Sequence, residues 1–238
     1  MESKYIKNCE VPSSGCDYSG CMGFDGIAAQ YMNSATWHAD ALGIGFNVLE
    51  KQHLFWIAIR TRIDIFRKPR MGESFTLETW TEPPTHLAFD RDYTIRSGDE
   101  ILSIGKTQWG LYNMELGKLE WGKNVYPEGL VPIAESNFSE RFYRFNDEPT
   151  EFLGNYIVRS TDIDLGGHMN NVKYITAVEG MFSVAEWERN AFRSIEIMYK
   201  KACFEGETIE FAKGETEVGM VVRGNVNGET AIWMLFRR

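Results

Sequence analysis

The sequence contains few cysteines and prolines, and it has no long apolar run. Four cysteines and seven prolines occur among 238 residues, whereas disulfide-rich secreted domains and proline-rich disordered chains carry many more. No apolar stretch approaches the roughly 20 residues that a membrane-spanning helix needs. The N-terminal residues also lack the apolar core of a secretory signal. We therefore expect a cytoplasmic globular protein that does not insert into membranes and whose cysteines are free thiols.

Basic residues are fewer than acidic ones. The chain has 25 Lys and Arg against 34 Asp and Glu, which gives a formal net charge of −9. Nucleic-acid binding needs basic surface to neutralise phosphates, so we expect no nucleic-acid partner. The four cysteines and four histidines lack the spacing of a zinc site, and we expect neither a metal nor a cofactor. The 43% hydrophobic content is ample for a large core.

The chain repeats itself once. Cys16–Met32 and Thr161–Ala177 each contain an Asp, a turn with glycine and then an amphipathic segment. Residues that are apolar except for His38 recur at helical spacing in both copies: Ile27, Tyr31, Ala35, His38 and Leu42 in the first, and Val172, Ile175, Val178, Phe182 and Ala185 in the second. We therefore predict one long helix after each turn, the second beginning near Asn170. This alignment puts Ser19 in the place of Asp164 and Gly23 in the place of His168.

A strand-rich stretch follows each predicted helix. Ile63–Glu82 resembles Ile195–Glu215, and Tyr93–Asn113 resembles Met220–Arg238, in alternating apolar runs joined by glycine turns. Ser97–Asp99 and Asn227–Gly228 stand where hairpin turns are expected. The intervening segment has three prolines and no clear periodicity. The pattern predicts an α+β fold with an N-terminal half at residues 1–125, a linker at 126–150 and a C-terminal half at 151–238.

The segment Thr161–Ile175, TDIDLGGHMNNVKYI, resembles the signature Asp-x-Asn-x-His-x-Asn-Asn-x-x-Tyr of the acyl-ACP thioesterase family. The matching positions are Asp164, His168, Asn170, Asn171 and Tyr174. Two positions depart from the family pattern, because Gly166 replaces an Asn and Ala202 replaces a Glu. Cys203 matches a cysteine of plant members, and the likeness extends over nearly the whole chain.

The resemblance implies a tandem, or double, hotdog fold, in which each half wraps a curved antiparallel sheet around a long central helix. It also implies hydrolysis of the thioester of a fatty acyl chain on acyl carrier protein, which ends fatty acid synthesis. Acyl carrier protein is then the expected partner, with Lys173, Lys200 and Lys201 as its expected contacts. The sequence leaves open whether the protein forms a homodimer.

The chemistry of the motif points to Asp164 and His168 as the catalytic pair. An imidazole titrates near neutral pH and suits a general base, with the carboxylate orienting it; the reverse, in which Asp164 activates the water, stays open. We expect substrate contacts from Gly166, Gly167, Asn170, Asn171 and Cys203. The alternative without catalysis is a capped turn. A strand-like setting favours a buried structural thiol over a nucleophile at Cys203.

The first half lacks this pair, so we expect one active site in each chain. Its helix carries large apolar side chains suited to an acyl tunnel: Phe24, Ile27, Tyr31, Met32 and Trp37. Two other functions stay open, an acyl-CoA thioesterase and a catalytically impaired acyl-binding protein. The replacements at Gly166 and Ala202 are what keep the second alternative open.

Overall fold

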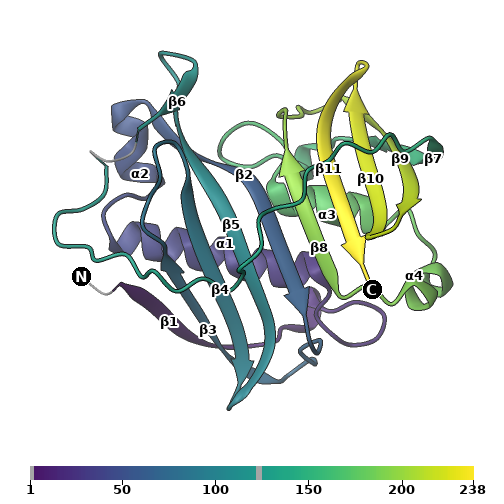
Figure 1. Ribbon diagram of the computed structural model, residues 1–238, viewed down its shortest axis with the longest axis horizontal. Helices are drawn as coiled ribbons and strands as arrows, with labels where there is room; N and C mark the ends of the chain where they lie inside the picture. The colour runs from purple at the N-terminus through teal and green to yellow at the C-terminus, as the bar shows by residue number, and fades with distance from the viewer. Residues whose placement is uncertain (1–2, 122–124) are drawn as a thin grey trace. The chain divides into compact units, whose positions relative to one another are not determined.

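The computed structural model describes residues 3–121 and 125–238. The chain divides into two compact units, Met1–Arg141 and Phe142–Arg238, which carry the purple-to-teal and green-to-yellow elements of Figure 1. Our narrower expectation of a separate linker at residues 126–150 stays a prediction.

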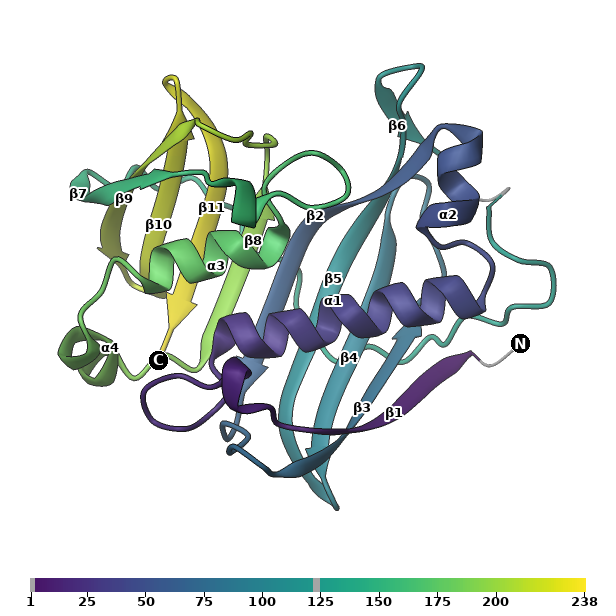
Figure 2. The same ribbon diagram turned by 180° about the vertical axis from the view of Figure 1, so that it is seen from behind.

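The N-terminal unit is an antiparallel sheet with one long helix across it. Its strands lie in the order β1-β3-β4-β5-β2, with β6 paired to β5. Its elements are β1 (Lys4–Glu10), α1 (Phe24–Ala41), α2 (Phe46–Leu49), β2 (Leu54–Ile65), β3 (Ser74–Thr81), β4 (Phe89–Ser97), β5 (Glu100–Asn113) and β6 (Lys118–Glu120). Helix α1 covers one face of this sheet, which we call the inner face (Figure 2).

Helix α1 forms where the apolar spacing predicted it. Phe24, Ile27 and Tyr31 are at most 1% exposed and face the sheet. The Tyr31 ring stacks on Tyr93 with 4.6 Å between centroids, and its hydroxyl pairs with a β5 serine at 2.7 Å. Gly105 of β5 permits this approach, because a Cβ there would lie 2.3 Å from the Tyr31 ring. The long first helix is therefore confirmed.

The C-terminal unit has the same plan with a shorter helix. Its strands lie in the order β8-β11-β10-β9-β7. Its elements are β7 (Glu151–Ile157), α3 (Asn171–Glu179), α4 (Val184–Asn190), β8 (Ser194–Tyr199), β9 (Thr208–Thr216), β10 (Gly219–Val226) and β11 (Glu229–Arg237). Both predicted hairpin turns are present, since Ser97 pairs with Glu100 and Val226 pairs with Glu229.

The prediction of one long second helix through Phe182 and Ala185 is wrong. Helix α3 ends at Glu179, and Gly180 caps it. Ser183 then begins α4 with a capping box, in which its side chain and that of Glu186 bond each other's backbone N–H groups. The apolar spacing continued through the break because α4 also turns an apolar side chain inward: Trp187 packs on Phe236 with 5.8 Å between centroids.

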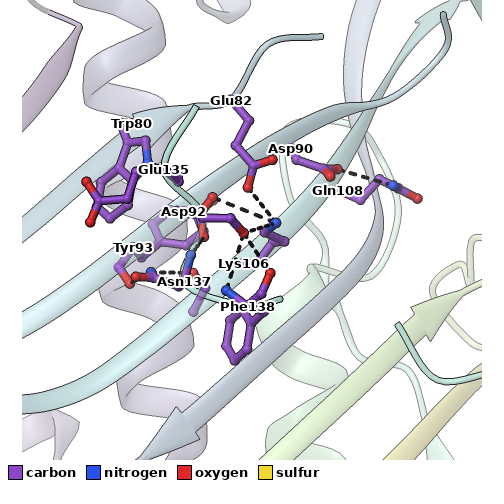
Figure 3. A network of polar contacts seen from close by, with 12 residues as sticks. Trp80, Glu82, Asp90, Asp92, Tyr93, Lys106, Gln108, Glu135, Asn137 and Phe138 are labelled. Carbon is purple, nitrogen blue, oxygen red and sulfur yellow. Dashed lines mark hydrogen bonds and ion pairs between the residues drawn. The ribbon is translucent and has the colours of Figure 1, made fainter. Parts of the chain in front are cut away.

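A polar network holds the segment after β6 against the outer face of the N-terminal sheet (Figure 3). Lys106 lies 2.5 Å from Glu82 and donates to the Ser136 hydroxyl at 2.6 Å. The buried Asp92 accepts from the backbone N–H of Asn137 at 2.8 Å. Burial raises the pKa of Asp92 to about 8. Burial opposes ionisation of Glu82 as well, but hydrogen bonds from Asp92 and Lys106 lower the pKa of Glu82.

The following residues are attached to the C-terminal sheet instead. The backbone N–H of Tyr143 donates to the buried Glu196 of β8, which also receives Arg237 at 3.0 Å. Phe145 stacks on Trp233 with 5.6 Å between centroids. The segment expected as a linker is therefore anchored at both ends, first to one sheet and then to the other.

Candidate active site

A tight turn leads into α3 and carries the predicted catalytic pair. The backbone N–H of Asp164 donates to the carbonyl of His168 at 3.0 Å, and the N–H of Gly167 donates to the Asp164 carbonyl at 3.0 Å. Gly167 has φ +77°, a left-handed conformation that favours glycine. The Asp164 carboxylate accepts the N–H of Gly166 at 2.8 Å. The local chain therefore fixes where the carboxylate points.

The turn brings Asp164 and His168 together. Asp164 Oδ1 lies 3.7 Å from His168 Nδ1, and about a quarter of each side chain is exposed, 26% and 25% respectively. This separation allows electrostatic attraction to a protonated imidazole, but it exceeds a hydrogen bond. Because Nδ1 faces the carboxylate, a proton-transfer role would fall to Nε2.

The N-terminus of α3 begins directly after this turn. Asn170 is the N-cap, and its side chain accepts the N–H of Val172 at 2.9 Å, while its carbonyl accepts that of Lys173 at 2.9 Å. No hydrogen bond joins the N–H of Asn171 to any other residue in the described part of the chain. That N–H lies at the positive end of the helix dipole, where negative charge is stabilised. The helix start expected near Asn170 is confirmed.

Cys203 holds the end of the turn through a backbone hydrogen bond. It is fully buried, and its carbonyl accepts the N–H of Met169 at 2.8 Å. Tyr174 of α3 places its hydroxyl 3.2 Å from the Cys203 backbone nitrogen. Burial raises the pKa of the Cys203 thiol, which disfavours the thiolate. The structure thus favours a supporting role for this cysteine over a nucleophilic one. Direct substrate contact at Cys203 stays a prediction, as it does at the exposed Gly166 and Gly167.

The N-terminal unit contains the same turn, and our alignment of the two was wrong by two residues. Cys16 bridges Met22 just as Ile163 bridges Met169. These bridges place Asp17, not Ser19, at the position of Asp164, and Cys21, not Gly23, at the position of His168. Both turns read Asp-x-x-Gly-x-Met, and that shared pattern was the signal available in the sequence.

The hydrogen bonds of the two turns agree one by one. Asp17 N–H donates to the Cys21 carbonyl at 2.8 Å, and Gly20 N–H donates to the Asp17 carbonyl at 3.0 Å. The Asp17 carboxylate accepts the N–H of Ser19 at 2.8 Å and pairs with Lys68 at 2.7 Å. The first turn therefore keeps the carboxylate but neutralises it with a lysine and has a thiol where the second has an imidazole.

Two further observations concern the described residues as a whole. In residues 3–121 and 125–238, no three His, Cys, Asp or Glu side chains gather as a metal-ligand set. No helix within those ranges is long and apolar enough to cross a bilayer.

Comparison with known proteins agrees with this architecture. Residues 2–121 match the acyl-ACP thioesterase N-terminal domain, and residues 146–231 match the C-terminal domain. An acyl-ACP thioesterase from Bacteroides thetaiotaomicron superposes with a TM-score of 0.82 at 21% identity, covering 99% of this chain and 97% of that one. A 12:0-ACP thioesterase from Umbellularia californica gives 0.82 at 16% identity, covering 100% and 97%. Likeness at such identity shows the fold.

The two units are therefore hotdog units, each an antiparallel sheet with a central helix, joined in tandem in one α+β chain. The chain belongs to the acyl-ACP thioesterase family.

Two curated relatives are longer than this chain. The oleoyl-acyl carrier protein thioesterase of Coriandrum sativum is 23% identical over 192 residues, covering 73% of this chain and 52% of the relative. The dodecanoyl-acyl-carrier-protein hydrolase of Umbellularia californica is 24% identical over 211 residues, covering 80% and 55%. The chain thus spans about half the length of these relatives, and the identity alone does not carry their substrates over to it.

Proposed function

We propose that this protein hydrolyses the thioester of a fatty acyl chain on acyl carrier protein and releases the free fatty acid. One observation carries the proposal: Asp164 and His168 lie 3.7 Å apart, partly exposed, in the turn that begins α3. Membership of the acyl-ACP thioesterase family supports it. Two relatives also support it, one named an oleoyl-acyl carrier protein thioesterase and the other a dodecanoyl-acyl-carrier-protein hydrolase.

The proposed reaction uses the turn and the helix end together. His168 takes a proton from water through Nε2 as the water oxygen attacks the thioester carbonyl carbon. Asp164 stabilises the imidazolium that forms. The N–H of Asn171 and the helix dipole stabilise the oxyanion. The carbon–sulfur bond then breaks, and His168 returns its proton to the leaving thiolate.

The carrier would dock by local charge, because the chain as a whole is acidic. A second basic run, Arg60–Arg70, is a weaker candidate, because its Arg67 is already paired with Glu73 at 2.7 Å and with Glu100 at 2.9 Å. Lys200, next to the site in sequence, is exposed. Lys201 is paired with Glu229. Lys200 and Lys173 are therefore the better candidates for contact with an acidic carrier.

All four cysteines are free thiols, which supports a reducing compartment, and we propose the cytoplasm. A homodimer stays a proposal for gel filtration to test.

The test compares matched variants of the two equivalent turns. His168→Ala should lower turnover of acyl-ACP by about two to four orders of magnitude, the range for loss of a general base. Cys21→Ala changes the equivalent position of the other unit and should leave turnover within about twofold, since the thiol has no part in the reaction. Equal activity in both variants would remove His168 from the mechanism.

The same assay separates the alternatives. Faster hydrolysis of acyl-CoA than of acyl-ACP would indicate an acyl-CoA thioesterase. An acyl-binding protein would bind acyl-ACP but turn it over near the uncatalysed rate, and Gly166→Asn with Ala202→Glu would then raise that rate sharply.

A further inference from the structure

A polar row crosses the inner face of the N-terminal sheet, where α1 should meet apolar side chains. Thr81 of β3 is paired with Arg91 of β4, Arg91 with Thr107 of β5, and Thr107 with Thr61 of β2. All four are at most 5% exposed. Because residues directly opposite in adjacent strands share a face, the four side chains form one buried line beneath the helix.

Arg91 lies in this row without a counter-ion. One guanidinium nitrogen contacts His38 Nδ1 of α1 at 2.9 Å and donates to Thr79 at 3.2 Å. Within residues 3–121 and 125–238, the charged or ionisable groups that act on Arg91 are Tyr93 and Tyr126, and no carboxylate forms an ion pair with it. Since the arginine is a donor only, His38 accepts through Nδ1 and is neutral. Burial lowers the pKa of Arg91, but an arginine remains charged. Removing the partner of a buried charge typically costs several kcal/mol.

Hydroxyl and indole groups on the same side of the sheet also lack well-formed hydrogen bonds. Four fully buried side-chain atoms make no hydrogen bond within the described residues: Thr81 Oγ1, Tyr93 OH, Trp109 Nε1 and Tyr126 OH. Tyr126 interacts with Thr81, and Tyr93 with Thr107 and Trp109, closely enough to oppose the effect of burial on the pKa of each tyrosine, although none of these contacts has good hydrogen-bond geometry. Burial raises the pKa of Tyr93 and Tyr126. Both are therefore neutral, and neither supplies the missing negative charge.

The fold itself does not require this row. In the C-terminal unit, the equivalent strands place Glu215 opposite Met220, Met220 opposite Phe236, and Phe236 opposite Ile195. Met220 thus occupies the position of Arg91, and Phe236 that of Thr107. Three of these four positions, Met220, Phe236 and Ile195, are apolar, so a hotdog sheet does not require a cation at this level. Among the described residues of this row and its C-terminal counterpart, the buried cation without a counter-ion belongs to the N-terminal unit, and a buried polar group without a good partner in a native protein calls for an explanation such as a bound ion, a water or a functional role.

We propose that the inner face of the N-terminal unit binds the carboxylate of an alkyl carboxylic acid, with Arg91 as its ion-pair partner and Tyr93 and Tyr126 as hydrogen-bond donors. One arginine balances one carboxylate, and guanidinium geometry suits that group. The surrounding side chains suit an alkyl chain, since Phe89 and Leu111 are buried on the same face. This site goes beyond the proposed function and does not depend on thioester cleavage.

Calorimetry on the full chain with octanoate, and with 1-octanol as the neutral control, tests the proposal. Arg91→Met copies the C-terminal unit. It should weaken octanoate binding about tenfold or more, the usual scale for a charge-assisted hydrogen bond, and leave 1-octanol unchanged. It should also raise the melting temperature, because a buried unpaired charge is removed. Tyr126→Phe, a smaller change, should weaken octanoate binding in the same direction.

Two results would overturn the proposal. One is octanoate binding that is equal in the wild type, Arg91→Met and Tyr126→Phe. The other is a melting temperature that falls in Arg91→Met while octanoate affinity is unaltered, since the row would then be structural. Binding needs no turnover, so an inactive enzyme that binds octanoate through Arg91 would refute the proposed function and not this site.

A second arm distinguishes two sources of the carboxylate, a free fatty acid and an acyl chain oxidised at its far end. Octanoyl-pantetheine and the pantetheine half-thioester of octanedioic acid are offered as substrates. Faster hydrolysis of the half-thioester that disappears in Arg91→Met indicates the oxidised acyl chain. Equal hydrolysis of both, with inhibition by octanoate that disappears in Arg91→Met, indicates the free acid. In a protein that hydrolyses octanoyl-pantetheine, absence of both effects counts against the site.

Discussion

The charge of Asp164 can be removed without removing its turn. Asp164→Asn keeps an oxygen that accepts the N–H of Gly166, which is 2.8 Å away in the native protein. Only the electrostatic effect on His168, 3.7 Å from the carboxylate, is lost. Asp17→Asn makes the same change in the equivalent turn of the N-terminal unit, where Ser19 takes the place of Gly166. The pair of variants therefore separates a catalytic charge from a turn-forming side chain.

The expected loss follows from Coulomb's law at this separation. Two unit charges 3.7 Å apart attract by about 1 kcal/mol at the dielectric constant of water and by about 4 kcal/mol at the value near 20 typical of protein surfaces. About a quarter of each side chain is exposed, so the effect lies between these limits. If the attraction is present only when the imidazole is protonated in the transition state, turnover falls by about fivefold to about 10³-fold.

Steady-state hydrolysis of acyl-ACP measures the effect, with kcat and KM determined separately. Asp164→Asn should lower kcat with little change in KM, because the charge acts on the transition state. Asp17→Asn should leave kcat within about twofold, and loss of its ion pair with Lys68 should lower stability slightly. Equal decreases of kcat in the two variants would refute the reasoning, as would an unchanged kcat in Asp164→Asn.

Three further outcomes concern the framework of the site. Burial raises the pKa of Asp92 to about 8. The contribution of Asp92 to stability is therefore complete below its unfolded pKa near 4 and decreases as the pH rises to 8. Urea unfolding between pH 5 and 8 should show a decrease in the free energy of unfolding of at most about 1.4 kcal/mol per pH unit, and Asp92→Asn should flatten this slope. Gly105→Ala would place a Cβ 2.3 Å from Tyr31 and should destabilise the fold by about 1–3 kcal/mol in thermal unfolding, whereas Gly180→Ala, with 3.4 Å of clearance, should not. Asn170→Ala removes the α3 cap and should cost about 1 kcal/mol in the same assay; no loss there would show that the cap is dispensable.

Local patterns in the sequence predicted much of the fold correctly. Helical spacing located α1, and short polar turns located the hairpins, because both depend on residues a few positions apart. The break between α3 and α4 was missed for a related reason. Gly180 and the Ser183 capping box interrupt the helix, yet the apolar period continues across them because both helices pack inward.

The sequence by itself determined the family, the two-unit plan and the turn that holds Asp164 and His168, because each depends on neighbouring residues. The tertiary structure decided the rest. The equivalence of Asp17 and Cys21 with that pair follows from hydrogen-bond register, which a gapless comparison of residue types placed two positions out. The row around Arg91 joins four strands through long-range pairing, and whether a buried charge has a partner depends on every chain segment packed against it.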